Sequence, residues 1–302
     1  MTPTYERAMS ATGTLASNRV GRVGFGAMQL AEPGRRSSTD RGAAEAVLRT
    51  AVELGVNHID TAEFYGRGVV NELIRSALHP YPDDLVLVSK VGAEHDEGAG
   101  LVAAQRPEQL RAGVEANLRS LGVDQLAVVN LRRMDAGPGL IATGDQVVDL
   151  DGQLAELAAL RDEGKIGGIG LSNVSADQLR RALPVGIACV QNSYNLLDRI
   201  AEPLLDLCRE HGLAWVPFFP LGSAFPGMAR VTDHPAVLGA AMALQLTPAQ
   251  IGLAWLLQHD PSTLLIPGTS SQAHLADNIA AAEVNLDPQT MSVLDRVALA
   301  AR

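Results

Sequence analysis

Three residues that follow apolar segments could together transfer a proton. Asp60 ends the short segment 58–60, Tyr65 comes five residues later, and Lys90 ends the apolar segment 85–90. The carboxyl ends of parallel strands meet at one edge of a sheet, where α/β proteins carry their chemistry. A lysine that ends a buried strand is costly unless it is paired, and Asp60 is the expected partner. A cation beside the phenol of Tyr65 would favour its ionised form, which would make Tyr65 a usable general acid.

Strand-like and helix-like segments alternate along the chain and predict a parallel sheet. Most of the strands are apolar without alternation, which is typical of a sheet that is buried on both faces. Eight strands are expected at residues 23–28, 58–60, 85–90, 126–131, 168–172, 188–192, 213–218 and 263–266, with helices at residues 40–54, 69–78, 107–121, 153–163, 176–183, 203–210, 248–258 and 272–282.

The number of these units predicts a closed barrel. Eight strand–helix units in 302 residues fit an α/β fold of the (β/α)8 TIM barrel type, as a single domain over residues 1–302. A hairpin at residues 12–20 is expected to cap the barrel, and residues 288–300 are expected to form an extra C-terminal helix. An open doubly wound sheet is the alternative, but the run Gly24-Phe25-Gly26-Ala27-Met28-Gln29 lacks the third glycine of its phosphate fingerprint, and no helix begins there.

The composition argues against several classes of protein. Hydrophobic residues make up 47% of the chain, which fits a globular protein. The net charge of −10 and the lack of a basic patch argue against nucleic-acid binding. Cys189 and Cys208 are too few for a disulfide framework and are expected to be buried thiols in a reducing compartment. No apolar run is long enough to span a membrane and no signal-peptide pattern is present, so we expect a cytoplasmic protein.

Short motifs along nearly the whole chain carry a resemblance to the aldo-keto reductase superfamily. In chain order they are Gly24–Met28, His58–Gly66, Ser89–Gly92, Gly170–Asn173, Val190–Asn192, Phe219–Gly222 and Ile266–Ser270. Within that superfamily, three runs resemble the bacterial pyridoxal reductase (pyridoxine 4-dehydrogenase) branch, namely Ala27–Leu30, Val128–Arg132 and Pro217–Gly222.

The resemblance implies a (β/α)8 barrel that binds NADP(H) in an extended form and reduces a carbonyl by hydride transfer. It implies that Tyr65 donates a proton to the carbonyl oxygen, that Lys90 makes this donation easier, and that Asp60 pairs with Lys90. Taken singly, Asp60 could be a helix cap, Lys90 a surface charge and Tyr65 a half-buried aromatic residue. Their joint position at strand ends favours the catalytic interpretation.

One catalytic position departs from the family pattern. At the end of the fourth strand most members of the family have a histidine, whereas this chain has Asn130. An amide can donate a hydrogen bond to a carbonyl oxygen, but it cannot exchange a proton near neutral pH. We therefore expect Tyr65 to be the sole acid and the pH dependence of a histidine to be missing. The alternative is that Asn130 marks a catalytically silent relative.

The resemblance also implies a set of cofactor-binding residues. By position they are Ser172, Asn173 and Gln191 for the nicotinamide carboxamide, Phe218 for stacking on the nicotinamide, Leu221, Gly222 and Ser223 for the pyrophosphate, Asn278 for the adenine, and Gly26, Met28, Ile266, Gly268, Thr269, Ser270 and His274 for the rest of the extended cofactor. Many relatives have Lys or Arg at the positions of Gly268 and His274, so we expect the preference for NADP over NAD to be weaker than usual. Ser172 and Asn173 could instead only cap a helix, and Gln191 could be a buried strand amide.

Substrate selectivity is expected to come from loops at the carboxyl ends of the strands. Met28, Phe64 and Phe225 are candidate apolar walls, and Arg132 lies by alternation on the same side of its strand as Asn130. Arg132 could face an anionic or ring-hydroxyl group of the substrate, or it could be a solvated loop residue.

The sequence predicts NADP(H)-dependent reduction of a small aldehyde or ketone to an alcohol, with the conversion of pyridoxal to pyridoxine as the leading reaction. The alternatives are a reductase of a sugar or antibiotic-pathway ketone and a slow-turnover regulatory subunit that binds NADPH. No metal site is predicted, and the expected partner is a small-molecule carbonyl compound rather than a nucleic acid or a membrane.

Overall fold

The computed structural model describes residues 12–31, 41–96, 98–137, 139–222 and 229–297. Seven strands form one parallel sheet in the order β11-β10-β9-β8-β5-β4-β3. Their bounds are β3 (Phe25–Gly26), β4 (His58–Asp60), β5 (Val86–Val91), β8 (Val128–Arg132), β9 (Ile169–Ser172), β10 (Ile187–Gln191) and β11 (Ala214–Trp215).

The segment 263–266 closes the sheet between β11 and β3. On one side, Leu264 N donates to Trp215 O at 2.8 Å; on the other, Gly24 N donates to Leu265 O at 2.7 Å and Leu265 N to Arg22 O at 2.8 Å. The segment contributes isolated bridges rather than a regular strand. The closure confirms the predicted barrel, with an eighth position that is shorter and less regular than expected. The prediction of a single domain over residues 1–302 stays a prediction.

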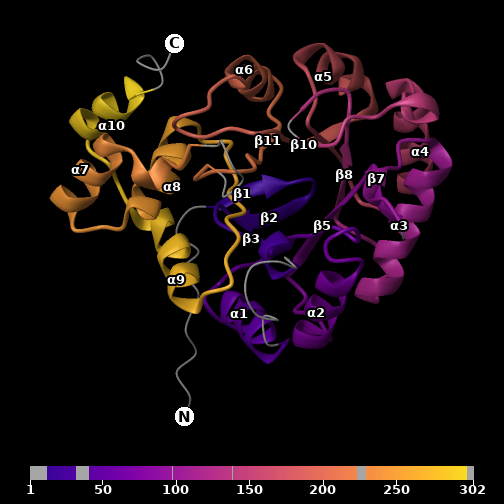
Figure 1. The fold of residues 1–302 in the computed structure, drawn as a ribbon, viewed down its shortest axis with the longest axis horizontal. Helices are drawn as coiled ribbons and strands as arrows, with labels where there is room; N and C mark the ends of the chain where they lie inside the picture. Colours follow the sequence, from indigo (N-terminus) through magenta and orange to yellow (C-terminus); the bar gives the residue numbers. More distant parts are fainter. Residues whose placement is uncertain (1–11, 32–40, 97, 138, 223–228, 298–302) are drawn as a thin grey trace.

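Helices surround the barrel in chain order (Figure 1). Those that follow the strands lie within a few residues of the predicted bounds: α1 (Arg41–Glu53), α2 (Val69–Leu78), α3 (Pro107–Leu121), α4 (Leu150–Asp162), α5 (Ala176–Ala182), α6 (Glu202–Glu210), α8 (Pro248–His259) and α9 (Gln272–Ala280). The extra C-terminal helix is α10 (Pro288–Asp295), and the end predicted for it at residue 300 lies outside the described residues. Short 3₁₀ turns are η1 (Ala27–Leu30), η2 (Gly144–Gln146), η3 (Leu183–Val185), η4 (Val231–Asp233) and η5 (Ala281–Glu283).

A two-stranded hairpin and a helix were not predicted. A hairpin of β6 (Ala93–Asp96) and β7 (Gly100–Ala103) lies in the connection after β5, and α7 (Pro235–Leu244) precedes α8. Within the described residues, no single helix is long and apolar enough to cross a membrane; α7 and α8 meet that test of length and composition only as a pair, and the pair is bent by 98°.

The barrel has two apolar cores. The larger core lies between the sheet and the helices, and the smaller one combines the hairpin residues Leu15 and Val20 with barrel residues such as Val86, Val128 and Leu264. The hairpin consists of β1 (Thr12–Leu15) and β2 (Asn18–Gly21), so it caps the barrel as predicted. The carboxyl ends of the parallel strands all lie at the end of the barrel opposite to this hairpin. The polar residues at these strand ends, such as Asp60 and Lys90, therefore gather there.

Cys189 and Cys208 are buried and carry free thiols, as predicted. Burial raises the pKa of both thiols, that of Cys208 to about 12. Neither is therefore a reactive thiolate near neutral pH.

Candidate active site

The predicted ion pair between Asp60 and Lys90 is present at the ends of two adjacent strands. β4 pairs in parallel with β5, and Asp60 and Lys90 are 3% and 5% exposed. Lys90 Nζ donates to Asp60 Oδ1 and, at 3.2 Å, to the backbone oxygen of Thr61. The second carboxylate oxygen, Oδ2, accepts from Gln191 Nε2 at 2.8 Å. The buried charges are thus paired and hydrogen-bonded, which offsets the cost of removing them from water.

Lys90 remains a cation in this environment. Burial by itself lowers the pKa of Lys90, but the Asp60 carboxylate and the hydroxyl of Tyr65 act against it and raise the pKa above its ordinary value. A lysine of this kind supplies a fixed positive charge rather than a proton that leaves near neutral pH.

Tyr65 lies directly against this cation. The ammonium of Lys90 is 5.1 Å from the centre of the Tyr65 ring. Tyr65 belongs to the connection between β4 and α2, and Phe64 packs edge-on against it with ring centres 5.2 Å apart. The predicted trio of Asp60, Tyr65 and Lys90 is therefore assembled, with the phenol at the place where a strand end meets a loop.

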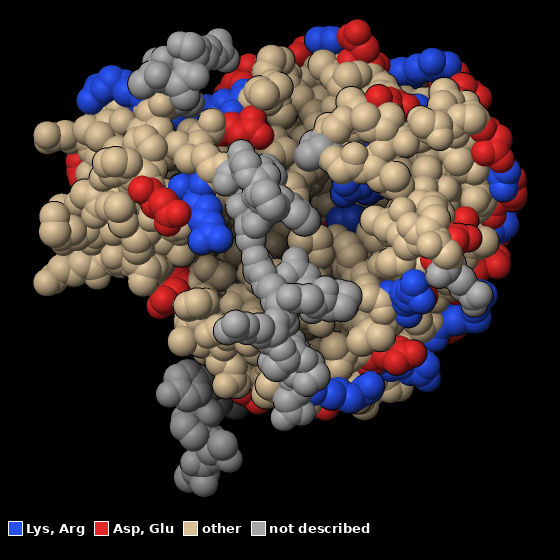
Figure 2. Space-filling model, viewed as in Figure 1, with Lys and Arg blue, Asp and Glu red and all other residues tan. Residues whose placement is uncertain are grey.

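The trio forms part of the wall of a cavity of about 180 Å³ at the carboxyl ends of the strands. The space-filling view shows a hollow near the centre of this face with basic side chains at its bottom (Figure 2). The basic residues in the wall are Lys90 and Arg132. The described residues that line it are Gly26, Met28, Gln29, Asp60, Tyr65, Lys90, Arg132, Ser172, Phe218, Phe219, Pro220, Leu221, Gly222, Ile266, Pro267, Gly268 and Asn278.

Asn130 lies beside the trio but does not line this cavity. It is fully buried, pairs in register with Lys90 on β5, and accepts a hydrogen bond from Cys189 Sγ at 3.3 Å. Its Nδ2 has no hydrogen-bond partner within the described part of the chain. Gly170 makes room for it, because a Cβ at that position would lie 2.0 Å from Asn130 Oδ1.

Among the other buried polar atoms without partners in the described part of the chain, two lie near this cavity. They are Ser172 Oγ and Gln191 Oε1, at the ends of β9 and β10. Buried polar atoms without partners are rare in proteins and indicate a missing ligand or water. A hydroxyl and an amide carbonyl at neighbouring strand ends fit the polar carboxamide of a nicotinamide.

The comparison with known proteins agrees with this geometry. Residues 22–299 match the aldo/keto reductase family profile. The chain belongs to the aldo/keto reductase family. It is 46% identical over 291 residues to pyridoxine 4-dehydrogenase of Escherichia coli, covering 95% of this chain and 98% of that one. It is 36% identical over 280 residues to an uncharacterized oxidoreductase of Schizosaccharomyces pombe, covering 91% and 86% of the two chains.

A solved structure supports the same family. An aldo/keto reductase from Klebsiella pneumoniae, in complex with NADP and acetate, superposes with a TM-score of 0.77 at 28% identity, over 95% of this chain and 94% of that one. The predicted family and the predicted oxidoreductase class are therefore confirmed. The roles of individual residues stay predictions.

Most of the cofactor residues predicted for this aldo/keto reductase lie around the cavity. Asn173 does not, because its Nδ2 donates to the backbone oxygens of Arg133 at 3.1 Å and Ala136 at 2.8 Å. Ser223 lies outside the described residues. Gln191 does not line the cavity either, but is buried next to Asp60, to which its Nε2 donates. The predicted cofactor residues that line the cavity are Gly26, Met28, Ser172, Phe218, Leu221, Gly222, Ile266, Gly268 and Asn278.

The residues predicted for the phosphate end lie at the start of α9. Thr269 is buried and its hydroxyl accepts from Ser271 N at 3.0 Å, while Ser271 Oγ accepts from His274 N and so caps the helix. Ser270 and His274 are exposed there. Since helix N-termini attract anions, these groups suit a phosphate, although none of them is a fixed cation.

The candidate substrate residues are divided between the cavity and its surroundings. Met28 and Arg132 line the cavity, Phe64 supports Tyr65 from behind, and Phe225 lies outside the described residues. Burial lowers the pKa of Arg132 and the nearby Tyr65 acts against this. The sequence prediction assigned no role to four lining residues, although all four stand inside the quoted motifs: Gln29, Phe219, Pro220 and Pro267.

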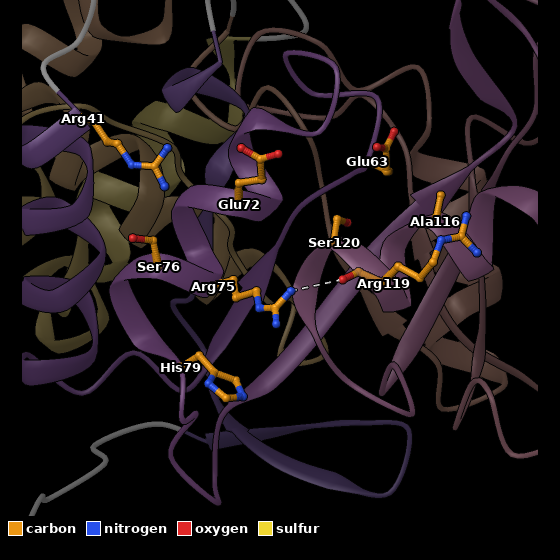
Figure 3. Close-up of a pocket in the computed structure, with 9 residues that line it drawn as sticks. All are labelled: Arg41, Glu63, Glu72, Arg75, Ser76, His79, Ala116, Arg119 and Ser120. Atoms are coloured by element: carbon orange, nitrogen blue, oxygen red, sulfur yellow. Dashed lines mark hydrogen bonds between the residues drawn. The ribbon is translucent and has the colours of Figure 1, made fainter.

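A second hollow lies on the outside of the barrel, between α2 and α3 (Figure 3). It is larger, at about 800 Å³, and mixes arginines such as Arg75 and Arg119 with Glu63 and Glu72. It holds none of the reacting groups named above, so the catalytic prediction remains with the cavity at the strand ends.

Proposed function

We propose that this aldo/keto reductase uses NADPH to reduce a small aldehyde, and that pyridoxal, reduced to pyridoxine, is its substrate. The observation that carries the proposal is the buried pair of Asp60 and Lys90 placed against Tyr65 in the wall of the cavity. The 46% identity to pyridoxine 4-dehydrogenase of Escherichia coli, over nearly the full length of both chains, supports the choice of substrate.

The chain offers a place for the nicotinamide. Ser172 and Gln191 would hold the carboxamide through their unpartnered oxygens, and Phe218 would stack on the ring. When it is bound, NADPH supplies a hydride to the carbonyl carbon. The family and the NADP complex of the Klebsiella pneumoniae relative support NADP(H) as the cofactor.

The proton is delivered by the chain itself. Negative charge builds on the carbonyl oxygen during reduction, so a donor must lie within hydrogen-bond reach of that oxygen. Tyr65 Oη is that donor, and Lys90 stabilises the phenolate that the transfer leaves behind. Asp60 keeps Lys90 in place and balances its charge. Asn130 is fully buried beside Lys90 and does not line the cavity, so no contact with the carbonyl is assigned to it.

Arg132 gives the cavity a preference for substrates with an acidic or hydroxyl group. It lines the same wall as Tyr65 and keeps its charge at all ordinary pH values. The ring hydroxyl of pyridoxal lies next to its aldehyde, so a guanidinium beside Tyr65 would contact the hydroxyl while the phenol contacts the aldehyde. The cytoplasmic location predicted from the sequence belongs to this proposal and stays a prediction.

The test is NADPH oxidation with pyridoxal and a panel of other aldehydes, for the unaltered protein, Tyr65→Phe and Tyr81→Phe. Tyr81 is a matched control, because it is a partly buried tyrosine whose hydroxyl donates to Leu121 O at 2.7 Å, away from the cavity. We expect Tyr65→Phe to lose about 10²- to 10⁴-fold in kcat and Tyr81→Phe to keep its rate.

Other results would correct the proposal in defined ways. Turnover of other aldehydes but not of pyridoxal would remove the substrate and keep the chemistry. Tight NADPH binding without turnover of any carbonyl would favour the regulatory subunit. An unchanged rate in Tyr65→Phe would remove the phenol as the proton donor.

A further inference from the structure

A buried hydrogen-bond network on the helix side of the sheet connects the two strands that carry the ion pair. Its centre consists of two asparagines, Asn71 in α2 and Asn117 in α3, which are 0% and 1% exposed. Asn71 Nδ2 donates to Asn117 Oδ1 at 2.9 Å. The two amides therefore join α2 to α3 beneath the surface.

Each asparagine also binds one strand. Thr61, directly after β4, donates from Oγ1 to Asn71 Oδ1 at 2.8 Å, and Ser89 in β5 donates from Oγ to Asn117 Oδ1 at 2.5 Å. Thr61 and Ser89 are both 0% exposed. Thr61 directly follows Asp60 in the chain, and Ser89 directly precedes Lys90. The network therefore binds the chain neighbour of each partner in the ion pair.

The orientation of the two amides is fixed by their bonds. Asn71 Nδ2 uses its second hydrogen on Ser120 Oγ at 3.0 Å, and Asn117 Nδ2 donates to Gly113 O at 2.9 Å. Turning Asn71 over would place its oxygen against the oxygen of Asn117, which is unfavourable. Ser120 forms the outer end of the network and lies on the groove between α2 and α3 (Figure 3).

The bond between Thr61 and Asn71 closes the loop that carries Tyr65. The two residues are ten apart in the chain, and Tyr65 lies between them. Inside this loop, Tyr65 N donates to Ala62 O at 3.0 Å and Val70 N donates to Tyr65 O at 3.4 Å. A shift of Asn71 or Thr61 would therefore move the base from which Tyr65 projects.

Thr61 also contacts the cation directly. Its backbone oxygen accepts from Lys90 Nζ at 3.2 Å, and its backbone N–H donates to Val88 O at 2.9 Å. Asn71 thus binds the side chain of Thr61, while β5 binds its backbone. The position of the Lys90 ammonium depends on this residue as well as on Asp60.

We propose that Thr61, Asn71 and Asn117 are positioning residues of the reaction: acting through Thr61, they fix the Lys90 ammonium relative to the Tyr65 hydroxyl. The inference rests on the proposed function, in which these two groups deliver the proton. According to this inference, three polar side chains that do not line the cavity influence the rate of the chemical step.

The first experiment compares Thr61→Val with Thr61→Ser. Valine keeps the shape and the backbone carbonyl but removes the hydroxyl, and serine restores it. With the aldehyde that the protein reduces fastest, we expect kcat to fall about tenfold in Thr61→Val with KM within about twofold, since the interaction acts on the chemical step rather than on binding. Thr61→Ser is expected to regain most of the rate.

The second experiment compares Asn71→Leu with Asn57→Leu. Asn57 is also buried, at 3% exposure, but lies before β4 at its other end, where it accepts from Gly21 N at 2.9 Å and donates to Arg19 O at 3.1 Å. Both changes remove buried hydrogen bonds, so both are expected to lower the free energy of unfolding. We expect kcat to fall only in Asn71→Leu.

The NMR signal of the Lys90 side chain, assigned by its loss in Lys90→Met, reports the same geometry without turnover. We expect it to move in Thr61→Val and Asn71→Leu and to keep its place in Thr61→Ser and Asn57→Leu. If the unaltered protein reduces no aldehyde, the proposed function fails, and this comparison still decides the positioning. An unchanged Lys90 signal and kcat in Thr61→Val, or an equal loss of kcat in Asn57→Leu and Asn71→Leu, would overturn the inference.

Discussion

Gln191 and Asp60 are joined across the barrel by a hydrogen bond of 2.8 Å from Gln191 Nε2 to Asp60 Oδ2. β10 and β4 carry these two residues, with β9, β8 and β5 between them in the sheet. One oxygen of the carboxylate therefore accepts from Lys90 and the other from Gln191. Because the amide nitrogen of Gln191 faces the carboxylate, its Oε1 faces away from it. In the proposed function, the cation beside the proton donor and the amide assigned to the nicotinamide carboxamide are therefore connected through one carboxylate.

Breaking the pair of Asp60 and Lys90 is expected to cost stability as well as activity. Asp60→Asn or Lys90→Met leaves the other charge buried and unpaired, so we expect each to lower the free energy of unfolding by about 3–5 kcal/mol. The double variant should recover part of that loss, because no lone charge remains, but none of the activity. Urea unfolding and NADPH oxidation measure the two effects. Single variants as stable as the unaltered protein would contradict this.

With Asn130 in place of a histidine, the rate of reduction is expected to show no change with pH that reflects the titration of a histidine. With an aldehyde that has no ionisable group, we expect kcat/KM to stay within about twofold between pH 6 and pH 8, since an amide does not titrate there. The measurement is NADPH oxidation in buffers of constant ionic strength. A step in this range that disappears when one of the seven histidines is replaced would refute the prediction.

Arg132 is expected to distinguish substrates by their hydroxyl group. In Arg132→Met we expect kcat/KM for pyridoxal to fall about 10- to 100-fold, as for the loss of a hydrogen bond to a charged group. Benzaldehyde lacks the hydroxyl, so its kcat/KM should change by less than about threefold in the same variant. Equal losses for both aldehydes would assign Arg132 to the structure of the cavity instead.

His58 makes the stability of the barrel depend on pH. It is 1% exposed, and burial lowers its pKa from 6.5 to about 4, with the backbone of Leu265 offsetting part of the shift. Between these two values the unfolded chain binds a proton that the folded chain does not, so stability is complete above about pH 6.5 and falls as the pH drops toward 4. A shift of this size corresponds to about 3 kcal/mol.

His58→Phe tests this contribution. The ring fills the space above Gly24, where a Cβ would lie 2.2 Å from His58 Nε2, and phenylalanine fills it without titrating. We expect the loss of unfolding free energy between pH 7 and pH 4 to be smaller in this variant by about 3 kcal/mol. His211→Asn, at an exposed site, serves as the control. The same pH dependence in all three proteins would remove His58 as its source.

His274→Arg is expected to strengthen the preference for NADP. The side chain is exposed in the first turn of α9, and a fixed guanidinium there can pair with the 2′-phosphate. We expect the ratio of kcat/KM with NADPH to that with NADH to rise about tenfold, the equivalent of one added charge-assisted hydrogen bond. His211→Arg, on an exposed residue after α6, controls for the added charge. If this ratio rose equally in both variants, the 2′-phosphate would not bind beside residue 274.

The sequence predicted that Asp60, Tyr65 and Lys90 lie together because strong rules apply to the strands that carry or precede them. A buried lysine needs a partner, strand ends gather at one edge, and eight apolar segments in 302 residues fit a barrel. The elements that escaped prediction give weaker signals. α7 is apolar on most sides and shows little helical periodicity, and β6 is mostly exposed, so no alternation of burial indicates a strand.

The polar network around Asn71 and Asn117 could not be predicted from the sequence. The two residues are 46 apart in the chain, and each is an ordinary helix residue in its own segment. Their bond depends on how α2 and α3 cross, which periodicity does not determine. The same limit applies to Asn173, whose amide contacts the loop at Arg133 and Ala136. Its sequence position indicates the neighbourhood but not the direction of the side chain.

The closure of the barrel through Arg22 has a consequence for the order in which the chain folds. The guanidinium donates to the backbone oxygens of Leu257 at 2.7 Å, Asp260 at 2.8 Å and Thr263 at 3.1 Å, and the last of these is 241 residues away. Contacts of such separation form late, because a long loop must close first. While the chain is being synthesised, β3 therefore remains an open sheet edge until the segment 263–266 has left the ribosome, and an open edge of this kind is able to pair with a wrong strand.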